Sequence, residues 1–573
     1  MTKTDPVTLE LLNNALSAVM DEMMITTRRT GYSGSIKYLM DFSAALCDRD
    51  GRMIAQGVAM PHHLGAMPGA IEAVRAKFGD TLEPGDIVIT NDPWEGSTHL
   101  PDIYLVKPIF WADELVAYAC HCSHHIDVGG RVPGSMAADS RSIHEEGIRI
   151  PPLKLYARGV ENEAIMAILR KNVRLPQMLM GDLRAQIVAC GIGEREVRAM
   201  FDKYGREMID LYWNELIDYG ERLCRSAIQD IADGTYSFAD YVDDDGVTGE
   251  PLKIQVELTV SGDDLKIDFA GSSAQTPGAI NSVMAWTLSA VYTVLRSVLP
   301  RYAPNNDGAF RPVTVVAPEG SFVNAKYPAA CAARGVTGHR LDDALFGAFA
   351  VALPEKIPAA SEGGNCSSRI SGTQPDGKQF ILQEVVCGSR GGRPNKDGVE
   401  GLVNPGQNLS NQPVEVVEAE FPVRINRYGF VPDSGGAGRY RGGLALMREW
   451  ELLVDNVIFQ QRSDRFQHAP WGVLGGQDGT LSKNVKNSGS AAEERLPAKF
   501  VLNMNKHDRV LYVTPGSGGY GDPFLREPEA VAHDVRNEKI SIEYARRGYG
   551  VVVDVATLEL NTEATAALRS AHE

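Results

Sequence analysis

Glycine-rich turns recur along the second half of the chain and restrict it to short elements of secondary structure. The 573 residues include 57 glycines and 31 prolines. Beyond Pro304 they gather in segments such as SGGAGRYRGG, LGGQDG and GSGGYGD. Glycine and proline favour turns and shorten the helices and strands between them. We therefore expect a β-rich body rather than a helical bundle.

The N-terminal part of the chain has a different pattern, in which one long helix precedes two hairpins. Apolar residues recur at three- and four-residue spacing between Pro6 and Gly31, and Asp5 can cap the first turn. Alternating apolar positions flank the Asp50-Gly51 turn, which predicts a β-hairpin. A second hairpin is predicted to turn at residues 111–113.

Helical and β-rich stretches divide the chain into two expected regions. Residues 160–232 have a helical pattern, whereas residues 251–270 are typical of a hairpin. We predict an α+β fold, as a large, β-rich mixed assembly with helices and hairpins near its N-terminus. The predicted regions are an N-terminal α/β region at 1–232 and a β-rich, glycine-rich C-terminal region at 233–573.

Charge and cysteine content narrow the classes of partner and compartment. The formal net charge of −17 disfavours nucleic acid or an anionic membrane as a partner, because both require a basic face. The eight cysteines are scattered and form no CxxC pair, which indicates reduced thiols. The N-terminus lacks the apolar core of a signal peptide, and no apolar run reaches about 18 residues. We therefore expect a cytoplasmic protein without a membrane span.

The strongest chemical signal is a concentration of imidazole and carboxylate side chains between Asn91 and Ser135. Such side chains beside glycine and proline turns can form a divalent-metal site. The alternative is that they are loop polar groups and hydrogen-bonded core histidines. We expect the site in the N-terminal helical and hairpin region. The segment contains His99, Asp102, His121, His124, His125 and Asp127.

Strand periodicity limits which of these histidines can meet. Successive side chains of a strand point to opposite faces, so His124 shares a face with Cys122 and lies opposite His121 and His125. Asp41 starts its own strand between two apolar neighbours, where a carboxylate needs a partner. A mixed set of nitrogen and oxygen donors suits Zn, Mn or Fe.

Two nucleotide-like motifs are better explained as turns. Gly372–Gln379 resembles the start of a P-loop but ends in glutamine, and its Asp-Gly pair indicates a hairpin. Gly516–Gly521 matches GxGxxG, but a proline follows it and too little chain remains for a dinucleotide fold. Four arginines in glycine-rich turns could bind an anionic substrate, although solvated loop arginines are commoner. They are Arg390, Arg393, Arg439 and Arg441.

Six motifs in order resemble the hydantoinase B family. They are NDPWEGSTHLPD, HHIDVGGRVPGS, DFAGSSAQTPGAIN, NNDGAFRPVTVVAPEGS, DSGGAGRYRGG and GSGGYGDP. The resemblance extends from about residue 5 to 555. The family includes B-type subunits of ATP-dependent N-methylhydantoinases and lactamases, the matching half of 5-oxoprolinase, and subunits of acetone and acetophenone carboxylases.

The resemblance implies a division of labour within a hetero-oligomer, such as a heterotetramer. ATP and Mg are bound by an A-type subunit, which phosphorylates the carbonyl oxygen of a cyclic amide, for example a hydantoin, a lactam or 5-oxoproline. The B-type chain completes the hydrolysis. The alternatives are a subunit of an ATP-dependent ketone carboxylase and a non-catalytic scaffold for the A-type subunit.

The resemblance also assigns roles to residues of this chain. It implies that a divalent metal is held by an aspartate, a His-x-x-Asp pair and a later histidine. These correspond to Asp41, His99, Asp102 and His124, with His125 as the rival for the last position. Asp41 or His125 is then the expected general base, although an Asp41 bound to the metal would be a poor free base.

Overall fold

The computed structural model describes residues 4–57, 60–363 and 367–571. They divide into two compact units, each made of several segments. The first unit contains Met1–Thr235, Gln255–Leu341 and Pro405–Leu409, and the second contains Tyr236–Ile254, Asp342–Asn404 and Ser410–Glu573. The chain passes between the units several times.

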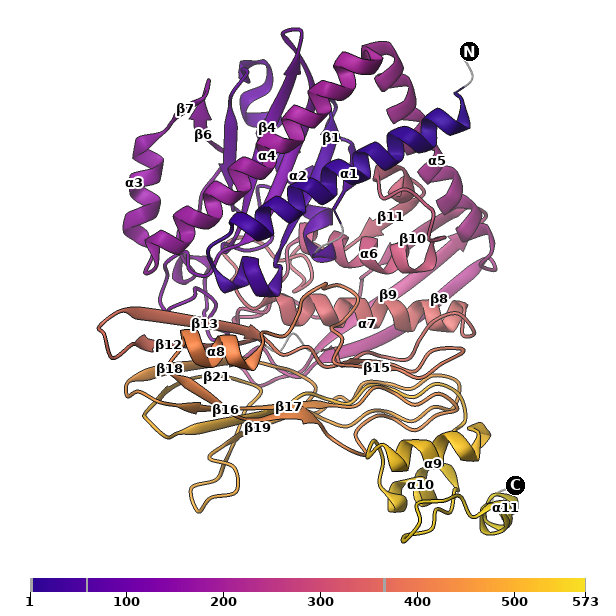
Figure 1. Ribbon diagram of the computed structural model, residues 1–573. Helices are drawn as coiled ribbons and strands as arrows, with labels where there is room; N and C mark the ends of the chain where they lie inside the picture. The colour runs from indigo at the N-terminus through magenta and orange to yellow at the C-terminus, as the bar shows by residue number, and fades with distance from the viewer. Residues whose placement is uncertain (1–3, 58–59, 364–366, 572–573) are drawn as a thin grey trace. The chain divides into compact units, whose positions relative to one another are not determined.

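An antiparallel sheet of seven strands forms the centre of the first unit, in the order β2-β1-β5-β4-β3-β6-β7 (Figure 1). Both predicted hairpins are present in it, as β1 with β2 and β4 with β5. The strands are β1 (Phe42–Asp48), β2 (Met53–Gln56), β3 (Ile87–Thr90), β4 (Asp102–Trp111), β5 (Glu114–His124), β6 (Leu153–Ala157) and β7 (Val160–Glu161).

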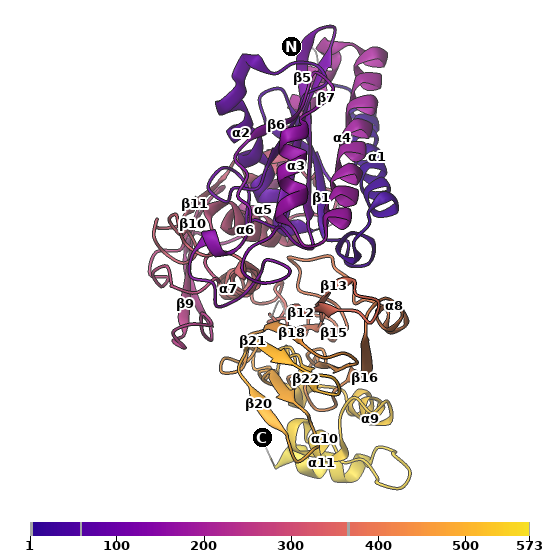
Figure 2. The same ribbon diagram turned by 90° about the vertical axis from the view of Figure 1, so that its left-hand side faces the viewer.

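Helices cover both faces of this sheet, with α1 and α4 on one side and α2 on the other (Figure 2). The predicted N-terminal helix is α1, and Asp5 caps it by accepting from the Thr8 backbone N–H at 2.9 Å. Two separate cores result, because strand side chains alternate between the faces. The helices are α1 (Pro6–Thr30), α2 (Met67–Phe78), α3 (Glu163–Asn172), α4 (Pro176–Tyr204) and α5 (Arg206–Gln229).

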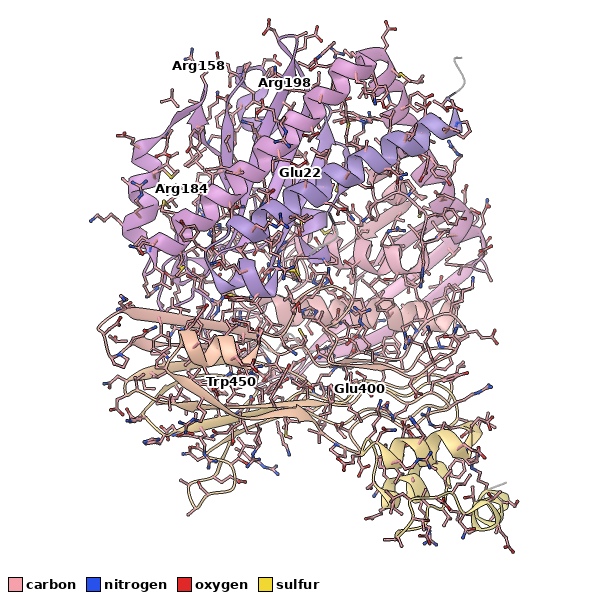
Figure 3. The ribbon with its side chains drawn as sticks, in the orientation of Figure 1. Glu22, Arg158, Arg184, Arg198, Glu400 and Trp450 are labelled. Atoms are coloured by element: carbon pink, nitrogen blue, oxygen red, sulfur yellow. The ribbon has the colours of Figure 1, made fainter. Side chains whose placement is uncertain are left out.

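The outer surface of the α1 and α4 layer carries charged side chains among exposed apolar ones such as Leu11 and Val188. Figure 3 labels Glu22 on α1 and Arg184 and Arg198 on α4. Glu22 pairs with Arg195 at 2.7 Å. Within the described ranges, no helix is both long and apolar enough to cross a membrane.

The remainder of the first unit contains a helix, a short sheet and several single turns. The strands β10 and β11 are parallel, and β10 forms the predicted hairpin with β9. The elements are β9 (Leu252–Ser261), β10 (Asp264–Asp268), β11 (Val313–Val316), α6 (Met284–Val298), η1 (Ser35–Leu39), η2 (Pro61–Ala66), η3 (Gly79–Thr81), η4 (Ile143–Glu145) and η5 (Asp307–Phe310). Helix α7 (Arg334–Ala352) then leads into the second unit.

Two antiparallel sheets share one apolar core in the second unit, and this core contains Trp450 (Figure 3). The first sheet has the order β13-β12-β18-β21 and the second has the order β16-β17-β22-β19-β20. The strands of these two sheets are β12 (Ser367–Thr373), β13 (Gln379–Val385), β16 (Val423–Phe430), β17 (Leu446–Leu452), β18 (Val457–Arg462), β19 (Lys483–Lys486), β20 (Glu494–Leu496), β21 (Lys499–Met504) and β22 (Arg509–Val513). β14 (Ser389–Arg390) and β15 (Val399–Glu400) form a separate pair, and β8 (Gly234–Val242) pairs with β9 in the sheet β11-β10-β9-β8.

Several helices occur where the sequence analysis expected mainly short strands. They form because their apolar residues pack on neighbouring segments, which propensity alone does not reveal. Besides α7 they are α8 (Val414–Glu420), η6 (Pro523–Leu525), α9 (Pro528–Arg536), α10 (Ile542–Tyr549) and α11 (Thr562–Ser570). Helices α9 and α10 share an apolar cluster with residues 551–560.

The glycine-rich segments of the second unit are closely packed extended backbone as well as turns. The Gly436 N–H donates to the Ser517 carbonyl at 2.8 Å, and the Gly519 N–H donates to the Gln477 carbonyl at 2.8 Å. A Cβ placed on Gly516 would lie 1.8 Å from the Ser434 carbonyl oxygen. Only glycine allows neighbouring backbones to approach this closely.

The two nucleotide-like motifs have the predicted non-nucleotide structures. Gly372 and Gln379 lie in the paired strands β12 and β13, with a turn between them. Gly516–Gly521 belongs to the packed glycine segments. Arg441, expected to be a solvated loop arginine, is instead buried and forms ion pairs with Glu400 at 2.8 Å and Asp534 at 3.3 Å.

Candidate metal centre

The ends of β4 and β5 bring two candidate metal ligands together. Asp102 is the first residue of β4, and the sheet register places it directly opposite His124, the last residue of β5. His99 belongs to the turn before β4, where its carbonyl accepts from the Asp102 N–H at 3.1 Å. All three residues are buried, so the fold removes their polar atoms from water.

The three side chains converge on one point. Asp102 Oδ1 lies 3.0 Å from His99 Nε2 and 2.9 Å from His124 Nδ1. The two imidazole nitrogens are 3.2 Å apart. Donor atoms at 2.0–2.2 Å from a shared ion are separated by about 3.0–3.5 Å, so this donor set fits a divalent metal.

Asp41, the residue before β1, approaches this cluster through His63 and is not among the three converging side chains. It follows the π-helix η1 and Met40, whose φ of 59° reverses the chain. The His124 backbone N–H donates to the Asp41 carbonyl at 3.0 Å, which fixes the two segments together. The Asp41 carboxylate faces His63, with 3.7 Å between Oδ1 and Nε2.

His63 is a member of the cluster that the sequence analysis did not single out. Its Nε2 lies 3.6 Å from Asp102 Oδ2, so it stands between the carboxylates of Asp41 and Asp102. Candidate ligand atoms of His63, Asp102 and Cys122 all lie within 4.8 Å of one another. The adjacent histidines of the sequence PHHLG were the available signal.

Arg334, at the start of α7, supplies the positive charge of the cluster. Its guanidinium forms an ion pair with Asp102 Oδ2 and donates to Thr98 Oγ1 at 2.8 Å. The guanidinium also lies 3.6 Å from the centre of the Trp286 ring. More than 230 residues separate it from Asp102 in sequence, so no local pattern indicated it.

Burial and charge set the protonation states of the cluster. Burial lowers the pKa of His99 to about 4, and Arg334 contributes in the same direction. Burial likewise lowers the pKa of His63 to about 3. Burial would raise the pKa of Asp102, but His99, Arg334 and His63 together hold it well below its usual value. Neutral imidazoles and an ionised carboxylate are the forms that bind metal.

His121 in β5 and His125 just after it face away from the cluster, as the two-residue period of a strand predicts. His121 Nε2 lies 2.8 Å from the hydroxyl of Thr27 on α1. His125 Nε2 lies 2.9 Å from the Gln186 side-chain oxygen on α4. The geometry therefore joins His124 to His99 and Asp102 and places His125 on the opposite face of the sheet.

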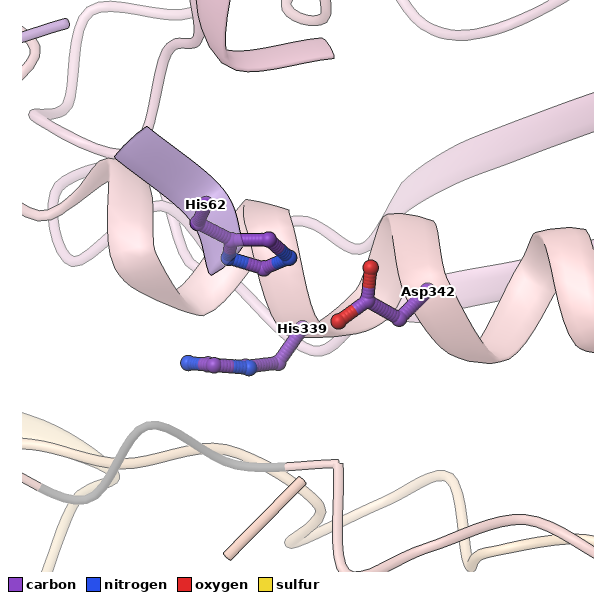
Figure 4. Close-up of side chains that lie close together, drawn as sticks. All are labelled: His62, His339 and Asp342. Carbon is purple, nitrogen blue, oxygen red and sulfur yellow. The ribbon is translucent and has the colours of Figure 1, made fainter. Parts of the chain in front are cut away.

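Two further residues near the cluster have structural contacts elsewhere. Asp127 accepts from the Gly134 N–H at 2.8 Å and pairs with Arg174 at 3.0 Å, which orders the loop after β5. His62, beside His63, turns toward α7 and stacks on His339 with 5.3 Å between ring centres. Figure 4 shows this pair of rings, with Asp342 following His339 about one helical turn later on α7.

The chain matches one protein family over most of its length. A family model described as Hydantoinase B/oxoprolinase matches residues 5–523. An uncharacterized protein of Methanocaldococcus jannaschii is 36% identical over 554 residues, which cover 96% of each chain. The B subunit of a putative D-/L-hydantoinase from a Pseudomonas species is 33% identical over 99% of this chain and 98% of its own. The beta subunit of the caprolactamase of Pseudomonas jessenii is 34% identical, with 100% of each chain covered.

Solved structures share the fold. The ATP-dependent caprolactamase from Pseudomonas jessenii has a TM-score of 0.93 at 32% identity, covering 99% of this chain and 100% of that one. A nucleotide-free acetone carboxylase has a TM-score of 0.92 at 20% identity and covers 99% and 83%. At that identity the second match shows the fold alone. Together the matches confirm the predicted α+β fold and the resemblance found in the sequence.

Proposed function

Because the chain belongs to the hydantoinase B/oxoprolinase family, we propose that it is the B-type subunit of an ATP-dependent cyclic-amide hydrolase. Relatives that match along their whole length are named as the B subunit of a hydantoinase and the beta subunit of a caprolactamase. The partner is an A-type subunit that binds ATP and Mg and phosphorylates the carbonyl oxygen of the ring.

The chemistry of an amide explains this division of labour. An unstrained amide hydrolyses slowly because resonance stabilises it and its nitrogen is a poor leaving group. Phosphorylation of the carbonyl oxygen removes that resonance and makes the carbon electrophilic. The B-type chain then has to bind the activated ring and present a water molecule with a nearby proton acceptor.

The observation that carries the proposal is the convergence of His99, Asp102 and His124 on one buried point. These residues, with Asp41, would hold a divalent ion such as Zn, Mn or Fe. Such an ion supplies Lewis acidity and makes water a stronger nucleophile. Arg334 holds the second oxygen of Asp102 and fixes the direction of the carboxylate.

The proton acceptor is Asp41 rather than His125. Asp41 lies at the edge of the cluster, where His63 connects it to Asp102. His125 contacts Gln186 on the far face of the sheet. A carboxylate bound to the ion is a weak base, so the two roles of Asp41 compete, and its orientation toward His63 supports proton transfer.

Metal content of the purified chain tests the site. We expect about one divalent ion per wild-type chain, measured by elemental mass spectrometry, and its loss in His99→Ala. An ion-free wild type, even after incubation with Zn, Mn or Fe salts, would refute the metal centre.

Turnover with the A-type subunit tests the reaction. We expect ATP-dependent ring opening of a hydantoin, a lactam or 5-oxoproline, and its loss in Asp41→Ala. Bicarbonate-dependent ATP turnover without ring opening would indicate a ketone carboxylase instead. Full activity in both Asp41→Ala and His99→Ala would indicate a scaffold.

The complex is proposed to act in the cytoplasm as a hetero-oligomer. All seven cysteines among the described residues are free and buried, which suits a reducing compartment. Native mass spectrometry of the co-purified subunits would give the stoichiometry, for which a heterotetramer is one expectation.

A further inference from the structure

The segment Cys331–Arg334 touches the candidate metal centre at two points. The Ala332 carbonyl oxygen lies 3.3 Å from His99 Nδ1, and Arg334 pairs with Asp102. A hydrogen bond from Nδ1–H to a carbonyl fixes the tautomer and the ring plane of a histidine, which leaves Nε2 free to bind metal. The position of this segment therefore controls how His99 faces Asp102 and His124.

Glu146 holds the segment in place. Its Oε1 accepts from the backbone N–H groups of both Cys331 and Ala332, each at 2.9 Å. Ala332 carries the carbonyl group that faces His99, and Cys331 precedes it. One buried side chain thus fixes two successive peptide groups, the first of them 185 residues away in sequence.

Glu146 is itself rigidly placed. It follows the single turn η4, and its N–H donates to the Ile143 carbonyl at 3.1 Å. The Ile143 N–H donates in turn to the Pro328 carbonyl at 3.1 Å, which ties the same turn to the residues just before the segment. The turn that carries Glu146 is therefore connected to this part of the chain by a backbone hydrogen bond as well as by the Glu146 side chain.

Burying a carboxyl group at this position costs folding free energy, which indicates that Glu146 has a role beyond packing. Glu146 is 1% exposed, and its Oε2 has no hydrogen-bond partner among the described residues. Burial raises the pKa of Glu146 to about 8, so the group is largely protonated at neutral pH. An apolar residue would avoid this cost but would leave two buried N–H groups unsatisfied.

We infer that Glu146 is a positioning residue of the metal centre, which orients His99 through the backbone of Cys331 and Ala332. This role rests on the proposed function, because it concerns the affinity of the same site for its ion. Glu146 does not touch substrate or metal in this role. It determines the position of the Ala332 carbonyl, which contacts the His99 ring.

The test compares metal binding in Glu146 variants of the full chain. The probes are Zn²⁺, with affinity measured by competition against a chromophoric chelator, and Co²⁺, whose visible absorption reports ligand geometry. Glu146→Ala removes the acceptor and is expected to weaken Zn²⁺ binding about tenfold or more and to shift the Co²⁺ band. Glu146→Gln keeps an acceptor oxygen in a neutral group and is expected to retain affinity within about threefold.

Two further variants separate positioning from stability. Glu146→Asp keeps a carboxyl group, but its shorter side chain moves the acceptor oxygen away from the two N–H groups. It should therefore weaken Zn²⁺ binding, and it provides the test if Glu146→Ala does not fold. Glu384→Ala removes another buried carboxyl, which pairs with Arg448 at 2.7 Å in the second unit. It should lower the melting temperature without changing the Zn²⁺ dissociation constant.

The outcomes distinguish this inference from the proposed function. Wild-type affinity and an unchanged Co²⁺ band in Glu146→Ala or Glu146→Asp would refute the positioning role and leave the metal centre standing. Equal weakening in Glu384→Ala would show that the effect is loss of stability and would also refute it. A wild type that binds neither ion would overturn the metal centre itself and this inference with it.

Discussion

The substitution Asp307→Asn should remove the free-energy cost that the ionised carboxylate of Asp307 imposes on the folded first unit near neutral pH. Asp307 starts η5, and its Oδ2 accepts from the Met53 N–H at 2.8 Å. Burial raises the pKa of this carboxyl from its ordinary value of 3.8 to about 6, and the nearby Asp48 contributes in the same direction. The folded state therefore binds this proton more tightly than the unfolded state does.

The sign and size of the effect follow from this pKa. Stability from the protonated group is fully present below about pH 4, is lost as the pH rises toward about 6, and stays lost above it. A shift of about two pH units corresponds to about 2–3 kcal/mol for a group that is mostly buried. Asn at position 307 resembles the protonated acid and can still accept from Met53.

Urea unfolding of wild type and Asp307→Asn between about pH 4 and 7 measures this difference. We expect equal stability near pH 4 and a variant about 2–3 kcal/mol more stable at pH 7. The control is Asp268→Asn, which removes a carboxyl whose hydrogen bond with Lys266 lowers its pKa below the ordinary value of 3.8. Its stability contribution is lost only as the pH falls below about 4, so the difference between this variant and wild type should change little between about pH 4 and 7. A difference between wild type and Asp307→Asn that does not change with pH would show that the Asp307 carboxyl has no raised pKa in the folded state.

Two other substitution pairs test the site and the glycine packing. His124→Ala should abolish metal binding, whereas His125→Ala should keep the ion and only lower stability, because its ring contacts α4 on the other face; equal metal loss in both, by elemental mass spectrometry, would contradict the assignment. Gly516→Ala should destabilise the second unit by about 3 kcal/mol or more, because its Cβ would overlap the Ser434 carbonyl. In Gly191→Ala, within α4, the added Cβ meets nothing within 4 Å beyond the neighbouring backbone of its own helix, so stability should instead rise by about 0.5–1 kcal/mol. A wild-type melting curve for Gly516→Ala would show that the backbones can separate at little cost.

Much of the candidate site follows from local rules. The spacing of His99 and Asp102 and the strand period of residues 121–125 are properties of neighbouring residues. They indicated which histidine shares a face with Cys122, and the structure agrees. Both hairpins were predictable in the same way, because turn residues such as Asp-Gly and alternating apolar residues determine register over short distances.

Residues whose role depends on distant contacts could not be recognised from the sequence. His63 enters the cluster because η2 lies against the ends of β1 and β4, and Arg334 enters from α7. The adjacent histidines of PHHLG are the one local signal for His63, whereas Arg334 has none that distinguishes it from an ordinary helix-terminal arginine. Glu146 is similar, since its importance comes from backbone groups 185 residues or more away.

Motifs, strand alternation and turn residues are local features, so they were sufficient to identify the family and the α+β class and to predict the donor types of the candidate site. Which of these groups meet depends on tertiary packing. Arg334 and the Ala332 carbonyl complete the surroundings of Asp102 and His99 because chain segments far apart in sequence pack together. The same holds for the glycine segments, where the absence of a side chain matters only when another backbone lies against it. Such contacts depend on the packing of the whole unit, which no short window of sequence contains.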